Sequence, residues 1–418
     1  MNRKVMAAAV MSALAAPALA QTSTVTLYGR ANLGIDNWAA TGSTSTTNDQ
    51  KSRMRVYDVG SRLGVRGVED LGGGLRAVFQ IESGLNADNG TNLGQGAQTN
   101  TSAGFLASRP SWVGLDGAFG RVLWGRQDVW WGNGTIAQTA ANYINTEVPW
   151  FTGGNGRVSV GVARQSNVFS YTSPTFGGFN ASLYWSPDTA GGGTSAANTV
   201  AGNTGLTFTN NETTNANKNP NARLLGLTAR WAGGPISAQY DYVSRETASD
   251  QFATGRPKNT AHKAGLGFMY APASTGQISI VATQTKLHDF NGAVFSAGTN
   301  LKQNAFALNW EHVFGNIQAL AQVGLLQKIT GCGGGAAALE AGAAAGTTVC
   351  DQSKAKAWMV GARYLASKRT AVYLTFNQIK NDANQFADYT GGSYTSNIGA
   401  AGAGSDPRVI ALGVIHNF

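Results

Sequence analysis

The sequence predicts an all-β fold, specifically a 16-stranded antiparallel transmembrane β-barrel with a long third loop folded into the lumen. Three observations point to this fold. Charged residues make up only 13% of the 418 residues, while 55 are glycine; the usual charged share is about a quarter. Apolar residues recur at every second position, which is the period of a strand. Short turns alternate with long polar loops, as in barrels that cross a membrane with many weakly apolar strands.

The first predicted element is an export signal. Arg3 and Lys4 precede the apolar stretch VMAAAVMSALAAPALA, which ends in a small-x-small cleavage site. We therefore expect a cleaved signal peptide over residues 1–20 and one barrel domain over residues 21–418. The alternative is a short membrane anchor, but the segment is short and Pro17 interrupts it. The formal charge is +9, yet an exported chain without runs of Lys or Arg is not expected to bind nucleic acid.

After the signal the chain is predicted to form hairpins, with seven short and eight long connections and hence sixteen strands. The short ones are 68–74, 116–120, 173–178, 232–235, 271–276, 315–316 and 366–369. The long ones, rich in Asn, Thr, Gly and Ser, are 37–50, 84–103, 128–165, 186–222, 244–260, 287–302, 327–355 and 381–406. Short turns at one rim and long loops at the other are the layout of an outer-membrane barrel.

Aromatic residues end the apolar faces of the later strands that run into short turns. They are Trp231, Tyr270, Phe314, Tyr364 and the C-terminal Phe418. Such residues prefer the membrane interface, so we expect a ring at one rim. A soluble β-sandwich is the alternative, but it would not need such long loops. The opposite, polar faces would line a water channel, because side chains cannot fill the space inside sixteen strands.

Arginines fall on the polar faces of the first strands. Those predicted to face the lumen are Arg30, Arg53, Arg55, Arg62, Arg66 and Arg76. An arginine facing lipid at mid-depth would cost roughly 2–4 kcal/mol, which favours the inward assignment. The alternative for some of them is a wide vestibule or contact with lipopolysaccharide at a rim.

Arg126 does not follow this rule. Strict alternation places it on the same face as Val122 and Trp124. Either a bulge intervenes or Trp124 faces the pore, and the sequence leaves both possibilities open.

The 128–165 connection is too long for a tight turn and unusually aromatic, with Trp130 and Trp131 near its start. These residues indicate a loop packed against something. Folding into the lumen would narrow the pore and set Asp128 and Glu147 opposite the arginines. A transverse field of that kind, with a basic excess, favours anions. The alternatives are an extracellular flap or a subunit contact.

The cysteine and histidine content argues against metal chemistry. Cys332 and Cys350 flank an Ala/Gly segment, and in an exported protein we expect one disulfide that closes this loop. The four histidines are scattered and show no zinc spacing. No cofactor or metal is expected.

Several stretches resemble the general porins of β-proteobacteria, a family that includes the neisserial porins. They are VTLYGRANLGI, SRLGVRGVEDLGGGLRAVFQIESG, WVGLDGAFGRVLWGRQ, FSYTSPTFGGF and the terminal GVIHNF. The resemblance implies a homotrimer in the outer membrane, in contact with its lipid and lipopolysaccharide, with a third loop inside each channel. It also implies that the outer-membrane insertion machinery reads Phe418. The cysteine pair is not a general feature of the family.

Three function classes remain to be weighed. The leading hypothesis is a passive, water-filled pore for small hydrophilic solutes and inorganic ions, with an anion bias set by width and wall charge. A hydrolase on a barrel would need a Ser-His or Asp-His constellation, and no Gly-x-Ser-x-Gly motif occurs, so no enzyme activity is expected. The third class is a substrate-specific channel or an adhesin, for which Trp130, Trp131 and Trp150 could form an aromatic track.

Overall fold

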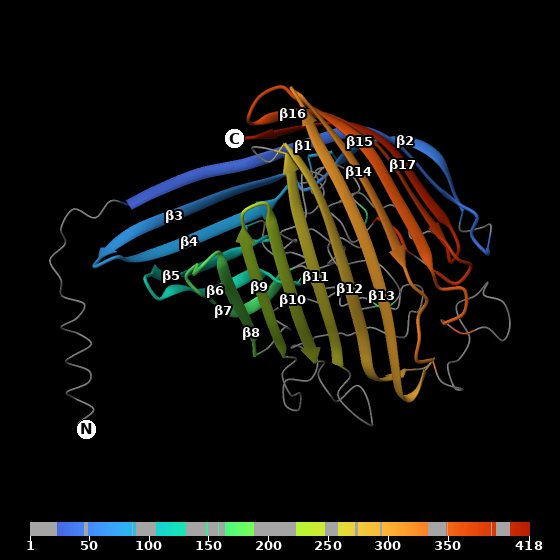
Figure 1. Ribbon diagram of the computed structural model, residues 1–418, viewed down its shortest axis with the longest axis horizontal. Helices are drawn as coiled ribbons and strands as arrows, with labels where there is room; N and C mark the ends of the chain where they lie inside the picture. The colour runs from blue at the N-terminus through green and yellow to red at the C-terminus, as the bar shows by residue number, and fades with distance from the viewer. Residues whose placement is uncertain are drawn as a thin grey trace.

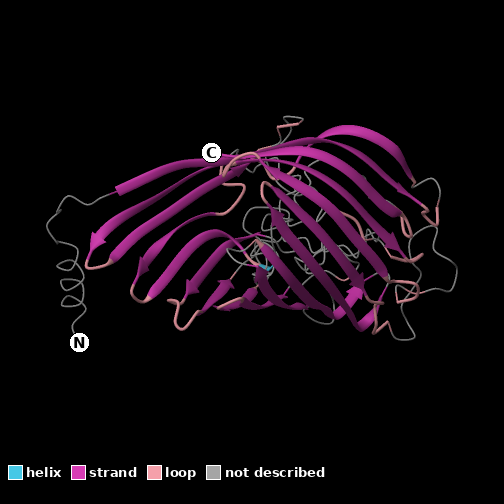
Figure 2. Ribbon diagram, turned by 45° about the horizontal axis from the view of Figure 1, so that its top comes forward, coloured by secondary structure: helices cyan, strands magenta, loops and turns pink. Residues whose placement is uncertain are grey.

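One antiparallel sheet that closes on itself makes up the protein (Figure 1). The computed structural model describes residues 23–45, 49–85, 87–88, 106–130, 148, 158, 164–187, 223–246, 258–271, 275–292, 295–332, 348, 350–385, 387–389 and 402–418, with side chains described outside 289–299. Strands form nearly all of the secondary structure in these ranges (Figure 2). The predicted signal peptide over residues 1–20 lies outside them. No helix among the described residues has the length and apolar character needed to cross a membrane.

The strands run in chain order around the sheet. Their bounds are β1 (Ser23–Thr41), β2 (Gln50–Asp58), β3 (Arg62–Gly72), β4 (Leu75–Gly84), β5 (Ser111–Gly117), β6 (Gly120–Asp128), β7 (Arg164–Thr172), β8 (Phe179–Ser186), β9 (Leu224–Gly233), β10 (Ile236–Glu246), β11 (Lys258–Ala271), β12 (Gly276–Gly292), β13 (Phe295–Phe314), β14 (Ile317–Leu326), β15 (Ala355–Leu365), β16 (Thr370–Asn381) and β17 (Asp406–Asn417).

β2 and β3 are two halves of one interrupted strand, so the ring has sixteen positions, which confirms the prediction. Both pair with the same edge of β1, and β17 pairs with its other edge and closes the barrel. The interruption at residues 59–61 stays hydrogen-bonded. The Asn32 amide donates to the Val59 carbonyl at 3.0 Å, and the Ser61 backbone N–H donates to Asp58 at 3.0 Å.

The connections follow the prediction at one rim and depart from it at the other. All seven short connections lie between consecutive antiparallel strands. The predicted long loop 287–302 is wrong, because β12 and β13 run through it and still pair at Gly292 and Phe295. The first predicted loop also begins later, since β1 continues to Thr41. A polar composition does not stop a strand that can keep its backbone hydrogen bonds.

The apolar faces lie outside, as alternation predicts. On β17, Ile410 and Leu412 are 44% and 54% exposed, whereas Val409 and Ala411 between them are buried. The five aromatic residues predicted to form a ring are all exposed and stand beside short turns or at the C-terminus, so they share the outer face at one end of the barrel.

The C-terminal residue takes part in barrel closure. The Gly29 N–H donates to the Phe418 carbonyl at 3.0 Å, and the Phe418 N–H donates to the Gly29 carbonyl at 3.1 Å. The Phe418 ring lies where a side chain on residue 29 would be, so only glycine leaves room for it. The terminal aromatic thus packs on the seam between β1 and β17.

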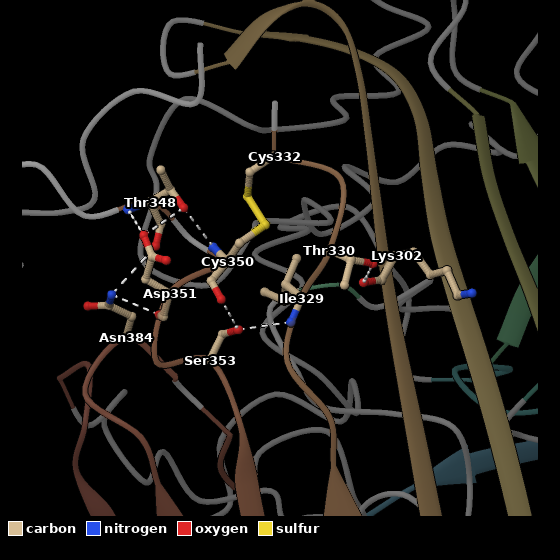
Figure 3. The surroundings of a disulfide bond; sticks show 9 residues. All are labelled: Lys302, Ile329, Thr330, Cys332, Thr348, Cys350, Asp351, Ser353 and Asn384. Carbon is tan, nitrogen blue, oxygen red and sulfur yellow. Dashed lines mark hydrogen bonds between the residues drawn. A yellow bond between two sulfur atoms is a disulfide. The ribbon is translucent and has the colours of Figure 1, made fainter. Parts of the chain in front are cut away.

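The predicted disulfide between Cys332 and Cys350 is present in the connection from β14 to β15 (Figure 3). Ser353 supports it, since its hydroxyl donates to the Cys350 carbonyl at 2.9 Å and accepts from the Ile329 N–H at 2.8 Å. Asn384, which follows β16, donates to the Asp351 carbonyl at 2.9 Å. The disulfide-bonded connection is therefore also joined to the segment after β16.

Candidate functional site

The inner wall of the first strands carries a charged cluster centred on Glu82 of β4. Its carboxylate accepts hydrogen bonds from Arg109 and, at 3.0 Å, from the Tyr28 hydroxyl, and lies 3.8 Å from the Arg62 Nε. Arg66 is exposed and its guanidinium carbon lies 5.2 Å from the centre of the Tyr28 ring. One carboxylate thus faces several guanidinium groups from β3 and from the segment before β5.

A second pair joins β1 to β2. Arg55 makes a two-pronged contact with Asp36, with Nε–Oδ1 and Nη2–Oδ2 distances of 2.9 Å each. The guanidinium groups of Arg53 and Arg55 both lie over the buried Trp38 ring, at 5.1 and 5.9 Å from its centre. Arg53 is exposed, so its charge reaches the lumen, while the charge of Arg55 is balanced by Asp36.

Asp128 ends β6 and lies opposite Arg164 of β7 in the sheet register. Its Oδ1 is 2.9 Å from the Arg164 Nε. Asp128 also borders a cavity of about 330 Å³ on the inner wall, together with Arg62, Glu82 and Arg109. The cavity wall therefore has charges of both signs.

Arg126 lies at a bulge, which resolves the ambiguity that the sequence left. The register shifts between Gly125 and Gln127, and Trp124 stays outside, 45% exposed. The Arg126 guanidinium donates to the Ser108 carbonyl at 3.1 Å and to the Ser166 hydroxyl at 2.8 Å.

Two of the predicted arginines are close to the short-turn rim. Arg76 pairs with Asp116 at 3.0 Å, and Asp116 also binds Arg121 at 2.8 Å. Arg30 donates to the Asn417 side chain at 2.9 Å, near the end of β17. The predicted arginines therefore share the inner face but lie at different depths.

Lys263 of β11 is a cation on the inner face of the later strands. Its ammonium is buried, lies 3.4 Å from Asp241, and donates to the Trp130 carbonyl at 3.3 Å. The ammonium also lies 5.2 Å from the centre of the Trp130 ring. Trp130 is therefore packed against the wall, as the loop-packing interpretation of the aromatic residues expected.

Two further residues of the connection between β6 and β7 contact inner side chains. The Val148 N–H donates to Gln322 of β14 at 2.9 Å, and the Val158 N–H donates to Gln303 of β13 at 3.4 Å. Glu147, predicted to face the arginines, lies outside the described residues.

Arginines outnumber carboxylates in this group of residues. Along the described inner wall of β1–β7, apart from the Arg76 cluster at the rim, the eight guanidiniums are Arg30, Arg53, Arg55, Arg62, Arg66, Arg109, Arg126 and Arg164, and the three carboxylates paired with them are Asp36, Glu82 and Asp128. The excess makes the potential along this wall positive, which attracts anions.

Sequence reasoning missed Arg109 and Arg164. Arg109 precedes Pro110, which hides the strand period, and Arg164 was placed in the long connection. Extending the strand predicted from residue 166 backwards by two residues would have flagged Arg164, whereas alternation from β5 places Arg109 on the outward face of Val113 and Leu115 and gives no signal for it.

Comparison with known proteins identifies the family. Residues 7–384 match the Gram-negative porin family. An outer membrane porin protein of Bordetella pertussis is 29% identical over 65% of this chain and 66% of that protein. Major outer membrane protein P.IB of Neisseria gonorrhoeae is 31% identical over 55% of this chain and 59% of its own length. The chain thus spans somewhat less than two thirds of these relatives. Outer membrane porin protein 32 of Delftia acidovorans is 28% identical over the whole of both chains.

Solved structures agree on the fold. An anion-selective porin from Comamonas acidovorans superposes with a TM-score of 0.66 at 23% identity, covering 95% of this chain and all of that one. The trimer form of OmpT from Vibrio cholerae gives 0.60 at 11% identity, over 95% of this chain and all of its own. The family match, the closed sixteen-position barrel and these relatives place the chain in the Gram-negative porin family of outer-membrane proteins.

Proposed function

We propose that the protein forms a water-filled channel for passive diffusion of small hydrophilic solutes and inorganic ions, with a preference for anions. The observation that carries the proposal is the excess of guanidinium groups on the inner wall. Arg53 and Arg66 matter most, because both are exposed and neither has a carboxylate within 4 Å in the described part of the chain. A wall of this charge concentrates anions and repels cations.

The channel is narrowed, in this proposal, by the connection between β6 and β7. Its support comes from three contacts: Trp130 with Lys263, Val148 with Gln322, and Val158 with Gln303. These partners lie on the inner faces of β11, β14 and β13, well away from β6 and β7 in the sheet order. A channel lacking most of this connection should conduct more current per step than the intact protein. Equal step sizes would argue for a loop outside the pore.

The test of the function is planar-bilayer recording with a salt gradient. Stepwise currents are expected, with a reversal potential of the sign that anion preference requires. A protein that inserts but carries no current, or one with the opposite sign of reversal potential, would contradict the proposal.

Assembly and export are proposed along with the channel. A homotrimer is supported by the trimer form of the OmpT structure and by family membership, and cross-linking should then yield a band of three chains. We also propose cleavage of residues 1–20, recognition of Phe418 by the insertion machinery, and contact with outer-membrane lipid and lipopolysaccharide. No catalytic role is proposed.

A solute-specific channel is the second candidate, and the mixed-charge cavity beside Asp128 and Arg109 favours it. Tyr184 and Trp112 also border this cavity and could stack against a solute. Block of single-channel current by micromolar amounts of a small charged solute would support it, and its absence would leave the general pore. The adhesin alternative draws no support from the described residues.

A further inference from the structure

The connection between β6 and β7 starts with a residue in an uncommon backbone conformation. Trp130 is the second residue after β6, is buried, and has a φ of +46°. For a bulky residue, a positive φ persists only where the surrounding contacts hold it. The contacts of Trp130 therefore determine where the connection starts and in which direction it leaves β6.

The ammonium group of Lys263 on β11 contacts Trp130 in two ways. It donates a hydrogen bond to the Trp130 carbonyl at 3.3 Å, and it lies 5.2 Å from the centre of the indole ring. An ammonium group held out of water over the face of a tryptophan is attracted to it. Since β7, β8, β9 and β10 separate β6 from β11 in the sheet, the contact joins the start of the connection to a distant part of the wall (Figure 1).

Lys263 is itself held in place by neighbours on the inner wall. The carboxylate of Asp241, directly opposite on β10, lies 3.4 Å from the ammonium group. It also accepts hydrogen bonds from the Thr228 hydroxyl at 2.6 Å and from the Gln239 amide at 2.7 Å. Lys263 and Asp241 are both buried, and a buried charge is strongly destabilised without its partners. The wall therefore presents an ammonium group to Trp130 in a fixed position.

Apolar packing supports the same contact. Val129 and Trp130 belong to one buried cluster with inner residues of β7, β9, β10 and β11, namely Val168, Leu224, Val243 and Ala261. Apolar burial has no preferred direction, whereas a hydrogen bond requires one distance and one angle. The cluster thus keeps the start of the connection near the wall, and Lys263 fixes its place there.

The alternative role for Lys263 is that of a cation that attracts permeating anions. Its side chain has no exposed surface and is paired with Asp241, whereas Arg53 and Arg66 on the opposite part of the wall are exposed. A buried, neutralised ammonium group contributes little to the potential that an ion in the lumen meets. The position of Lys263 is therefore suited to holding the connection.

We propose that Lys263, held by Asp241, is a latch that keeps the start of the β6–β7 connection against the wall and so keeps the channel open. Val129 and Trp130 have the wall behind them, so their release moves them into the lumen, where they obstruct the flow of ions. The proposal rests on the proposed channel function. A hydrogen bond to a charged group shifts an equilibrium of this kind about tenfold or more.

Planar-bilayer recording of the full-length protein at a fixed voltage measures the fraction of time that each channel spends closed. The double variant Lys263→Met with Asp241→Asn removes the latch and leaves no unpaired buried charge. Its closed time should rise about tenfold over that of the native chain. Its fully open step and its reversal potential should equal the native values, because the latch neither narrows the open lumen nor contributes charge to it.

A second variant changes the same contact from the side of the connection. Trp130→Ala removes the ring and leaves the pair of Lys263 and Asp241 intact, so it tests the latch even if the double variant does not fold. Its closed time should rise about fivefold, the factor expected for loss of a desolvated contact between a cation and an aromatic ring.

Two controls match the change in charge and the loss of stability. Lys286→Met removes a lysine from the outward face of the neighbouring β12. Replacing Cys332 and Cys350 by Ser removes a cross-link far from Trp130 in the chain. Both controls should keep the closed time within about twofold of the native value.

The outcomes separate the latch from the channel function. Native closed times in both latch variants, or an equal rise in the controls, would overturn the latch while the channel function stands. A shift of reversal potential in the double variant would also overturn it, because Lys263 would then act on the permeating ions. A native chain without stepwise current would instead contradict the channel function itself.

Discussion

Neutralising one exposed guanidinium on the inner wall should weaken anion preference by a predictable amount. Arg66 is the residue of choice, because its side chain is exposed and its guanidinium contacts the Tyr28 ring and no carboxylate among the described residues. The variant is Arg66→Gln, which keeps a polar side chain of similar reach. Arg76→Gln is the matched control, since it removes the same charge from the neighbouring strand.

The magnitude follows from Coulomb's law in the lumen. An ion passing about 6 Å from the guanidinium interacts with it by roughly 0.7 kcal/mol in water. Screening at 0.1 M salt, with a Debye length of about 10 Å, reduces this to about 0.4 kcal/mol. A chloride loses this attraction and a potassium ion loses an equal repulsion, so their relative free energies change by about 0.8 kcal/mol. The chloride-to-potassium permeability ratio should therefore fall about fourfold.

The control variant Arg76→Gln should change the permeability ratio less than Arg66→Gln does, because Arg76 already has a carboxylate partner. Arg76 is paired with Asp116 at 3.0 Å, and Asp116 also binds Arg121. Removing Arg76 leaves Asp116 balanced by Arg121 at the rim, so the ratio should change by less than about twofold. Reversal potentials in a tenfold KCl gradient measure both variants. An unchanged ratio in Arg66→Gln, or an equal change in Arg76→Gln, would refute the reasoning.

Three further outcomes are expected. Arg109→Ala breaks a buried ion pair with Glu82 and should lower the free energy of unfolding by about 3–5 kcal/mol. The Arg76 side chain is 51% exposed, so Arg76→Ala should lower the free energy of unfolding by less than about 1 kcal/mol. The midpoints of urea unfolding compare the two variants, and equal shifts would contradict the buried pairing. Cys332 and Cys350 are 18 residues apart, and replacing both by Ser removes the cross-link and should lower the free energy of unfolding by about 3 kcal/mol. Single-channel conductance should stay unchanged, and a lower conductance would mean that the loop reaches the pore. Hydrogen bonds from Thr348 lower the pKa of Asp351, so their stabilisation is complete above about pH 4, the ordinary carboxyl pKa, and is lost as pH falls through the lower folded value. Protease cleavage near Asp351 should accordingly rise only in acid for the native chain but already at neutral pH for Asp351→Ala, and identical pH profiles would argue against the carboxylate.

Alternation alone was enough to assign most residues to a face. Arg62 and Arg66 separate from Leu63 and Val65 by the two-residue period, and the structure keeps that separation. The physical reason is local: a strand sends successive side chains to opposite sides, and a guanidinium that faces hydrocarbon at mid-depth is strongly disfavoured. The sixteen positions followed from counting the connections between such two-faced segments.

Predictions that depended on loop length were less reliable. The segment 287–302 is rich in polar residues, yet β12 and β13 pair through it. The polarity of a segment indicates whether its side chains face water or an apolar environment. The length of a strand depends instead on whether its backbone can keep hydrogen-bonding to the neighbouring strand. The position of Arg126 had a similar cause, since the register shift between Gly125 and Gln127 cannot be read from alternation.

The sequence by itself determined the fold class, the two faces of most strands and the chemistry of each face, because these depend on residue type and a period of two. Only the tertiary structure decided which charges meet. Glu82 binds Arg109 across 27 residues, Arg55 binds Asp36 across the first hairpin, and Phe418 reaches Gly29 from the far end of the chain. Those contacts depend on register and on closure of the ring, which bring together residues whose separation along the chain carries no signal of their meeting.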